Sequence, residues 1–212
     1  MSKPDPPAED EVPGSAPERD GQRERWNRRY AERGVAALQG PPAEWLVDNE
    51  DMLAGPPGRR ALDIACGDGR NAAFLARVGL AVDAVDISDV VVDALRIAAA
   101  QHGASVNPLR VDLAREPLPA ADYDVIVVFN YLQRSLFPAL RRALAPGGIL
   151  IVETMTRAHT DHAGSAINPR FLLEPGELRT SFPELEVVRY REGVFRRGNR
   201  RRALASLVAR HR

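Results

Sequence analysis

Short apolar runs alternate with amphipathic segments through most of this chain. Each run has the length of a buried strand, and we expect strands at 61–65, 81–85, 106–111, 125–129 and 149–152. Three intervening segments carry apolar residues at helical spacing and end at glycine or proline, which predicts helices at 71–78, 88–103 and 135–145. Strands that alternate with helices in this way form a parallel sheet covered on both faces.

The end of the chain follows a different pattern. Two strand-like runs, 185–190 and 203–209, are separated only by Glu192–Arg202, which is too short for a crossover helix, so we expect them to pair antiparallel. The run 125–129 is wholly apolar and predicts a central strand, whereas Pro108 places its strand at an edge or makes it irregular. The expected fold class is α/β, a Rossmann-like three-layer sandwich.

The N-terminal part has its own character. Residues 1–18 are rich in proline and acids, which predicts a mobile tail. A helix is expected from Arg19 to Arg33, with Trp26 and Tyr30 four apart on one face, and a second at 42–53. We therefore expect a tail at 1–18, a helical cap or lid at 19–54 and one main domain at 55–212.

Composition narrows the functional classes. The chain has 212 residues, 27% of them charged, with a formal net charge of zero, so no general attraction to nucleic acid or acidic membranes is expected. Its apolar runs are far shorter than the roughly 18 residues of a membrane helix. The N-terminus has no apolar signal region and Cys66 is the single cysteine, so we expect a cytoplasmic protein. The sequence does not indicate an oligomeric state.

The segment after the first expected strand carries the chemistry. Gly67-x-Gly69-x-x-Ala72 lies between a strand and a helix, and Asp86 follows at the distance of a dinucleotide-binding fingerprint. Glycines let the backbone approach a ligand, and the helix N-terminus offers free N–H groups. The pattern predicts a cofactor that contains a nucleoside, without saying which one.

Three aspartates favour S-adenosylmethionine over a nicotinamide. Asp63 lies inside the first strand, where a carboxylate needs a cation, such as the ammonium group of a methionine moiety, while a pyrophosphate would repel it. Asp86 at the end of the second strand can accept both ribose hydroxyls, with Ile87 packing on the adenine. Asp112 after the third strand can accept from the adenine amino group. Three carboxylates at successive strand ends predict a cradle for a cationic adenosine ligand.

These residues resemble a known family, the class I S-adenosylmethionine-dependent methyltransferases, and within it the tellurite-resistance-type small-molecule enzymes. The resemblance covers about residues 24–209 and rests on matching segments at 62–71, 85–88, 111–113, 123–132 and 144–154. It implies a seven-stranded sheet whose last strand is antiparallel. It also implies that Asn130, Tyr131 and Leu132 line the cofactor and methyl-transfer site, and that Trp26-Asn27-Arg28-Arg29-Tyr30 belongs to a lid.

The expected cofactor contacts are therefore fifteen residues: Asp63, Ala65, Cys66, Gly67, Gly69, Asn71, Asp86, Ile87, Asp112, Leu113, Asn130, Tyr131, Leu132, Trp26 and Tyr30. Plainer roles stay open for several of them. Asp63 can bond to nearby backbone, Asp86 can cap the next helix and Asp112 can start a turn. Asn71 can simply begin its helix, and Cys66 can be a small residue in a turn. Trp26 and Tyr30 can pack the helical cap against the main domain.

Candidates for the reacting groups lie after the fourth and fifth strands. A base is needed only if the acceptor arrives protonated, and Tyr131, Glu153, His159 and His162 are candidates. Arg134, Arg157 and Arg170 are candidates for holding an anionic substrate, and 155–175 is expected to form a lid with the N-terminal helix. His159 and His162 flank Asp161, but no Cys or His cluster completes a metal site, so no metal is expected.

The leading prediction is methyl transfer from S-adenosylmethionine to a small molecule. An RNA methyltransferase remains an alternative because of the arginines at 196–202, which a solvated hairpin end also explains. A nicotinamide-dependent oxidoreductase is the second alternative, against which Asp63 and the C-terminal hairpin argue. A non-catalytic binding module is the third.

Overall fold

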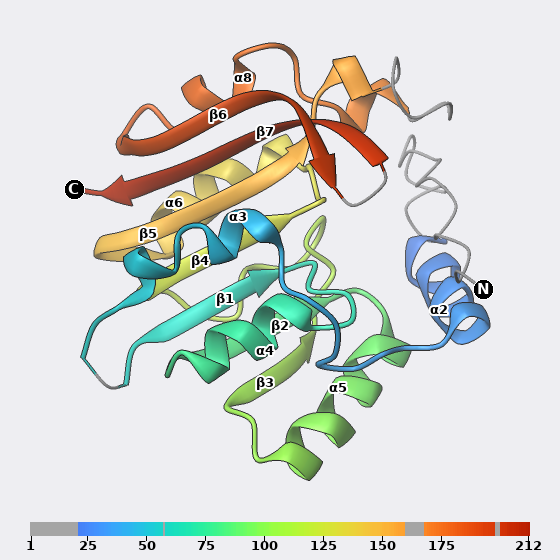
Figure 1. Ribbon diagram of the computed structural model, residues 1–212. Helices are drawn as coiled ribbons and strands as arrows, with labels where there is room; N and C mark the ends of the chain where they lie inside the picture. Colours follow the sequence, from blue (N-terminus) through green and yellow to red (C-terminus); the bar gives the residue numbers. More distant parts are fainter. Residues whose placement is uncertain (1–20, 57, 160–167, 198–199) are drawn as a thin grey trace.

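The computed structural model describes all residues except 1–20, 57, 160–167 and 198–199, and the expected tail at 1–18 lies outside this part. One seven-stranded sheet runs through the molecule in the order β3-β2-β1-β4-β5-β7-β6 (Figure 1). The strands are β1 (Arg60–Ile64), β2 (Ala81–Asp86), β3 (Val106–Arg110), β4 (Tyr123–Phe129), β5 (Leu144–Met155), β6 (Leu185–Arg197) and β7 (Arg200–His211).

Strands β1 to β5 pair in parallel, and β7 pairs antiparallel with both β5 and β6. This confirms the predicted fold class, the seven strands and the antiparallel last strand. β4 lies at the centre with Val125, Ile126 and Val127 fully buried, as its apolar run predicts. β3, the strand with Pro108, is an edge strand.

Helices cover both faces of the sheet. The longer ones are α2 (Gln22–Arg33), α4 (Arg70–Arg77), α5 (Asp89–His102) and α6 (Phe137–Ala143), and the shorter ones are α3 (Glu44–Val47) and α8 (Glu177–Thr180). Single 3-10 turns form η1 (Glu50–Leu53), η2 (Arg134–Leu136), η3 (Arg157–His159) and η4 (Pro169–Phe171). One hydrophobic core joins α3, α4 and α5 to the sheet, and a second joins α6 and α8 to the opposite face (Figure 1).

Strand β5 begins earlier than the sequence predicts. The expected turn at 146–148 is a bulge inside the strand, because Tyr123 pairs with Leu144 whereas Val125 already pairs with Ile149. A Cβ atom on Gly148 would lie 2.8 Å from the Ala145 carbonyl oxygen and 2.9 Å from that of Tyr123, so only glycine fits there.

Two helix predictions are also modified. The segment expected to be helical at 42–53 is α3 followed by η1, because Asn49 between them has φ −119° and leaves the helical region. The helix expected at 135–145 is η2 followed by α6, with Pro138 in the first turn of α6, where a missing N–H costs nothing.

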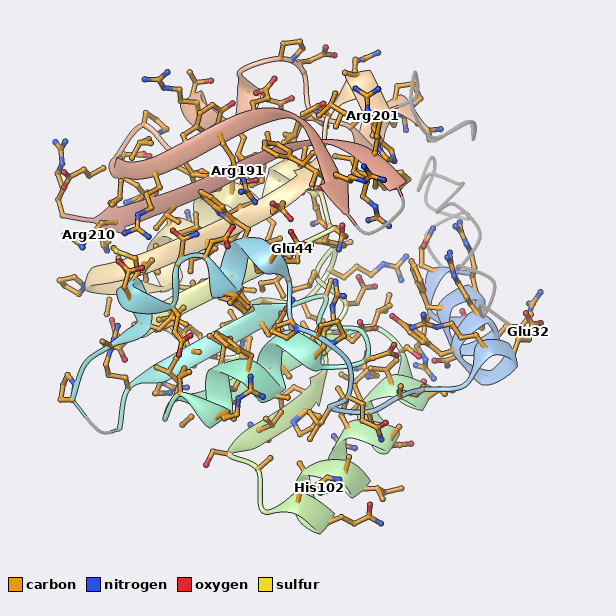
Figure 2. The ribbon with its side chains drawn as sticks, in the orientation of Figure 1. Glu32, Glu44, His102, Arg191, Arg201 and Arg210 are labelled. Atoms are coloured by element: carbon orange, nitrogen blue, oxygen red, sulfur yellow. The ribbon has the colours of Figure 1, made fainter. Side chains whose placement is uncertain are left out.

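The two C-terminal strands are longer than their apolar runs. Beyond the predicted ranges, pairing continues through Phe195 with Arg202 and Arg196 with Arg201, so the arginine-rich stretch forms the end of a β-hairpin. Arg201 marks this end in Figure 2. None of the helices in the described part of the chain has the length and apolar character of a membrane span.

Candidate cofactor site

The glycine loop connects β1 to α4 with three residues in the left-handed region. Ala65 has φ 51°, Gly67 has φ 53° and Gly69, the N-cap of α4, has φ 74°. A Cβ atom on Gly69 would lie 2.5 Å from a Leu95 methyl carbon of α5. The loop therefore packs closely against α5, and its conformation depends on glycine residues.

Asp63 is buried beneath this loop. The residue is 1% exposed, and its Oδ2 has no hydrogen-bond partner within the described structure. Burial raises the pKa of this carboxyl group from 3.8 to about 7, against the opposing effect of a backbone hydrogen bond from Ala72. An orphaned buried carboxylate oxygen is costly, and a cationic ligand group would relieve that cost.

Asp86 ends β2 and braces the same loop. Its Oδ2 accepts the Gly67 N–H at 3.1 Å and its Oδ1 accepts the Ser88 N–H at 3.0 Å. Burial raises the pKa of Asp86, partly offset by these backbone donors. A carboxylate offers about four lone-pair sites, so Asp86 can still accept two hydroxyls. Ile87 follows it and is half-buried.

Asp112 lies after β3 in a tight turn. Its Oδ1 accepts the Ala114 N–H at 3.0 Å and its Oδ2 lies 3.7 Å from the Nε of Arg115. This arrangement fits the plainer role of starting a turn and leaves acceptor capacity for a ligand. The next residue, Leu113, is buried, and its carbonyl accepts a hydrogen bond from Gln133.

The segment after β4 also lies at this end of the sheet. Asn130 has φ 54°, and its N–H donates to the Glu153 carbonyl at 2.9 Å. Ala65 and Asn130, two non-glycine residues in left-handed conformations, thus follow the adjacent strands β1 and β4. Strained backbone of this kind gathers at ligand sites.

Tyr131 and Leu132 continue this segment. Burial, with smaller contributions from Asp112 and Asp86, raises the pKa of the Tyr131 phenol well above its usual range. Its hydroxyl donates to Gln133 at 2.6 Å, and Leu132 is buried in the core. Tyr131 therefore lies near two of the three aspartates as a protonated hydrogen-bond donor.

Helix α2 packs over the glycine loop. Tyr30 is buried, with its ring centroid 5.7 Å from that of Trp26. Burial and the charge of Asp86 raise the Tyr30 pKa above its usual range. Asn27 accepts the Ser88 hydroxyl at 2.7 Å and donates to Asp89 at 3.0 Å. The helix is thus joined to the loops that follow both β1 and β2.

Cys66 and Asn71 have local partners. The Cys66 thiol is buried in the glycine loop, and burial raises its pKa well above the usual value. The side-chain oxygen of Asn71 accepts the Ala43 N–H at 2.9 Å, which ties α4 to the segment before α3. A direct contact of either residue with a cofactor stays a prediction.

Glu153 belongs to a polar cluster that sequence reasoning missed. Its Oε2 accepts the Ser206 hydroxyl at 2.7 Å and the Arg191 guanidinium at 3.3 Å. Arg191, labelled in Figure 2, also stacks 4.2 Å from the Trp45 ring centroid. The available signal was Ser206, a hydroxyl inside the apolar run 203–209. As a candidate base, Glu153 is held in place by two partners.

His159 and Arg134 are also engaged with protein groups. The Nδ1 of His159 accepts the Ala203 N–H at 3.3 Å, which fixes a neutral ring with its proton on Nε2. Arg134 donates to the Glu177 carboxylate at 2.7 Å and to the carbonyls of Arg170 and Leu172. His162 lies outside the described residues. Within those residues, no group of three or more His, Cys, Asp or Glu is arranged to hold a metal.

Comparisons with known proteins identify the class of this fold and site. Residues 61–148, which span β1 to the β5 bulge, match the family described as "Methyltransferase domain". A solved structure described as an S-adenosylmethionine-dependent methyltransferase from Mesorhizobium loti superposes with a TM-score of 0.64 at 19% identity, covering 82% of this chain and 100% of that one. Residues 61–148 therefore match a methyltransferase-domain family, and the chain shares its fold with a solved structure described as an S-adenosylmethionine-dependent methyltransferase.

Individual relatives add detail. A ubiquinone biosynthesis O-methyltransferase from Marinobacter nauticus is 30% identical over 119 residues, 52% of this chain and 49% of that protein. The chain spans about half the length of this curated relative. TehB from Haemophilus influenzae has a TM-score of 0.69 at 18% identity, covering 88% of this chain and 67% of that one, which is a likeness of fold. These comparisons confirm the predicted class and favour neither alternative enzyme.

The residues present fit the cofactor of this class. The orphaned Oδ2 of Asp63 suits an ammonium group, and Asp86 retains capacity for two hydroxyls. Gly67 and Gly69 bring backbone close to the same place. A pyrophosphate at this position would meet two buried carboxylates, which disfavours a dinucleotide.

Proposed function

We propose that this chain binds S-adenosylmethionine across the carboxyl ends of β1, β2 and β3 and catalyses methyl transfer to a small-molecule acceptor. The observation that carries the proposal is the buried, unpartnered Oδ2 of Asp63 beside Asp86 and the glycine loop. The methyltransferase-domain match at 61–148 contains all three aspartates. We assign the ammonium group to Asp63, the ribose hydroxyls to Asp86 and the adenine amino group to Asp112.

The cofactor supplies an already activated methyl group, so the protein needs mainly to position an acceptor and exclude water. α2 supplies part of that exclusion, since the Tyr30 hydroxyl lies against Gly67 and the Trp26 ring packs beside the Tyr30 ring. The Tyr131 hydroxyl donates its one proton to Gln133, so toward an acceptor molecule it offers its oxygen as a hydrogen-bond acceptor. Glu153, held by Ser206 and Arg191, is our candidate for receiving a proton if the acceptor arrives protonated.

The net charge of the chain and its curated relative both favour a small molecule as the methyl acceptor. Its net charge is zero, so no electrostatic basis for general nucleic-acid binding is present. The named curated relative, a ubiquinone biosynthesis O-methyltransferase, supports the same class of acceptor. We retain residues 19–54 as a cap and 55–212 as the main domain.

A thermal shift experiment with S-adenosylhomocysteine and NAD in parallel tests this proposal. Binding to the folded state raises the melting temperature according to the ratio of ligand concentration to Kd. We expect a clear upward shift with S-adenosylhomocysteine and none with NAD. A shift with NAD alone would overturn the proposal. Retention of RNA that falls steeply with added salt would instead support the RNA methyltransferase alternative.

A further inference from the structure

A charged hollow is lined by segments that follow β4 and β5 in the chain. Its volume is about 380 Å³, and it is lined by Arg134, Arg157, Pro169, Arg170, Glu174 and Glu177. These residues come from η2, from η3, and from the stretch that runs from η4 to the start of α8. The volume is within the range of small-molecule sites, so the hollow can admit more than a single ion.

The charges in this hollow do not balance. Arg134 is paired with Glu177, and Arg157 is paired with Glu174. Arg170 is the third cation, and its side chain has no hydrogen-bond or ion-pair partner among the residues that the structure describes. The lining residues that the structure describes therefore carry one more positive charge than negative.

The backbone of Arg170 is held from both sides. Its N–H donates to the Asn168 side chain at 3.1 Å, and its carbonyl accepts a hydrogen bond from Arg134 at 2.9 Å. Arg134 is itself fixed by Glu177 and the Leu172 carbonyl. Because the backbone of Arg170 is already anchored, less conformational freedom is lost when its side chain binds a ligand.

One residue that lines the hollow, Arg134, lies close in sequence to the segment proposed for methyl transfer. Arg134 follows Asn130, Tyr131 and Leu132 after a single residue, Gln133, which contacts the Tyr131 hydroxyl. Arg134 also donates to the Arg170 carbonyl, so it connects the hollow to this segment. This relation depends on the proposed function, whereas the charge excess does not.

We propose that this hollow binds the carboxylate of an organic acid, which on the proposed function is the methyl acceptor. A guanidinium presents a planar fork that matches a carboxylate. Among the described lining residues, the Arg170 guanidinium is the one left without a carboxylate partner, and it can form one such pair with a ligand. The carboxylate is an anchor, and the methylated atom lies elsewhere on the same molecule.

An NMR titration of the full chain with benzoate tests this inference. Amide resonances of residues 157, 170 and 174 should shift on adding benzoate, and benzyl alcohol should leave them unchanged. Arg170→Gln should weaken benzoate binding by about five-fold, the upper order for one solvent-accessible ion pair.

Arg142→Gln is the matched control, since Arg142 is an exposed arginine on α6 outside the hollow, and it should leave benzoate binding unchanged. The inference is overturned if Arg170→Gln binds benzoate as wild type does, or if benzyl alcohol shifts the three resonances as benzoate does.

S-adenosylhomocysteine added to the same sample separates the two proposals. Shifts at Gly67 and Asp86 report the cofactor site, and shifts at Arg170 report the hollow. If benzoate shifts the hollow while S-adenosylhomocysteine shifts nothing, the proposed function fails and the carboxylate site stands. If S-adenosylhomocysteine binds and benzoate does not, the carboxylate site fails alone.

Discussion

The hydroxyl of Tyr30 lies 3.2 Å from the position that a Cβ atom on Gly67 would occupy. Helix α2 therefore contacts the glycine loop at the residue whose N–H donates to Asp86. Gly67→Ala adds a methyl group at this contact and places alanine at φ 53°. We expect a loss of about 1 kcal/mol in stability from the left-handed backbone, and weaker binding of S-adenosylhomocysteine because Tyr30 must move.

Gly79→Ala is the control for this prediction. Gly79 has φ 95° and no atom within 4 Å of its Cβ position, so alanine there introduces backbone strain without a clash. Chemical unfolding should show similar losses for both variants, and calorimetry should show weaker ligand binding for Gly67→Ala only. Equal ligand affinity in the two variants would disprove the Tyr30 contact.

Asp63 should make stability depend on pH. Its folded-state pKa is about 7 against an ordinary value of 3.8, so the folded protein keeps a proton that the unfolded chain releases between these values. Stability therefore falls as pH rises from about 4 to 7, by on the order of 3 to 4 kcal/mol from this group, and is flat above. Asp63→Asn should be more stable than wild type at pH 8, and urea unfolding should show this advantage shrinking towards pH 5.

The same substitution should have the opposite effect on the ligand. The amide side chain of the Asp63→Asn variant carries no charge for an ammonium group, and loss of a charge-assisted hydrogen bond corresponds to roughly tenfold or more in affinity. Calorimetry with S-adenosylhomocysteine at pH 8 measures this effect. A variant that gains stability and keeps full affinity would remove Asp63 from the cofactor site.

Asn27 should control the docking of α2. Asn27→Ala removes the hydrogen bonds to Ser88 and Asp89, which hold the helix against the loop after β2. We expect faster hydrogen exchange in α2 and faster proteolysis near it, with S-adenosylhomocysteine restoring less protection than in wild type. Glu32→Ala on the same helix is the control, because Glu32 points away from the body of the protein (Figure 2).

Arg191 should be important for stability. Its guanidinium stacks on the rings of Trp45 and Phe195 and donates to the buried Glu153. Arg191→Ala removes this packing and the guanidinium that donates to the buried carboxylate, which we expect to cost about 3 kcal/mol. Arg96→Ala, which removes an exposed pair with Asp93 on α5, should change stability by less than about 0.5 kcal/mol. Similar losses for both variants in chemical unfolding would contradict this account.

Local patterns were sufficient for much of the fold and for the main parts of the site. The run 125–129 and a helix that begins near Ser88 could be predicted, because burial on both faces and helix boundaries are encoded within a few residues. The glycine loop and Asp86 could be predicted for the same reason. The hydrogen bond that joins them comes from the parallel pairing of β1 with β2.

Contacts between distant residues could not be predicted. Glu153 pairs with Arg191 and Ser206, which are 38 and 53 residues away, and Arg134 pairs with Glu177, 43 residues away. Many arginines were equally plausible partners, and only the register of β5, β6 and β7 selects Arg191. Arg134, proposed from sequence as a substrate-holding residue, is mainly occupied in holding the segment before α8.

A crystal structure with S-adenosylhomocysteine tests the central claim most directly. The account predicts that the amino group of the ligand lies within hydrogen-bonding distance of the Asp63 carboxylate and that both ribose hydroxyls donate to Asp86. A ligand bound at another place, or bound at the glycine loop with its amino group turned away from Asp63, would contradict it.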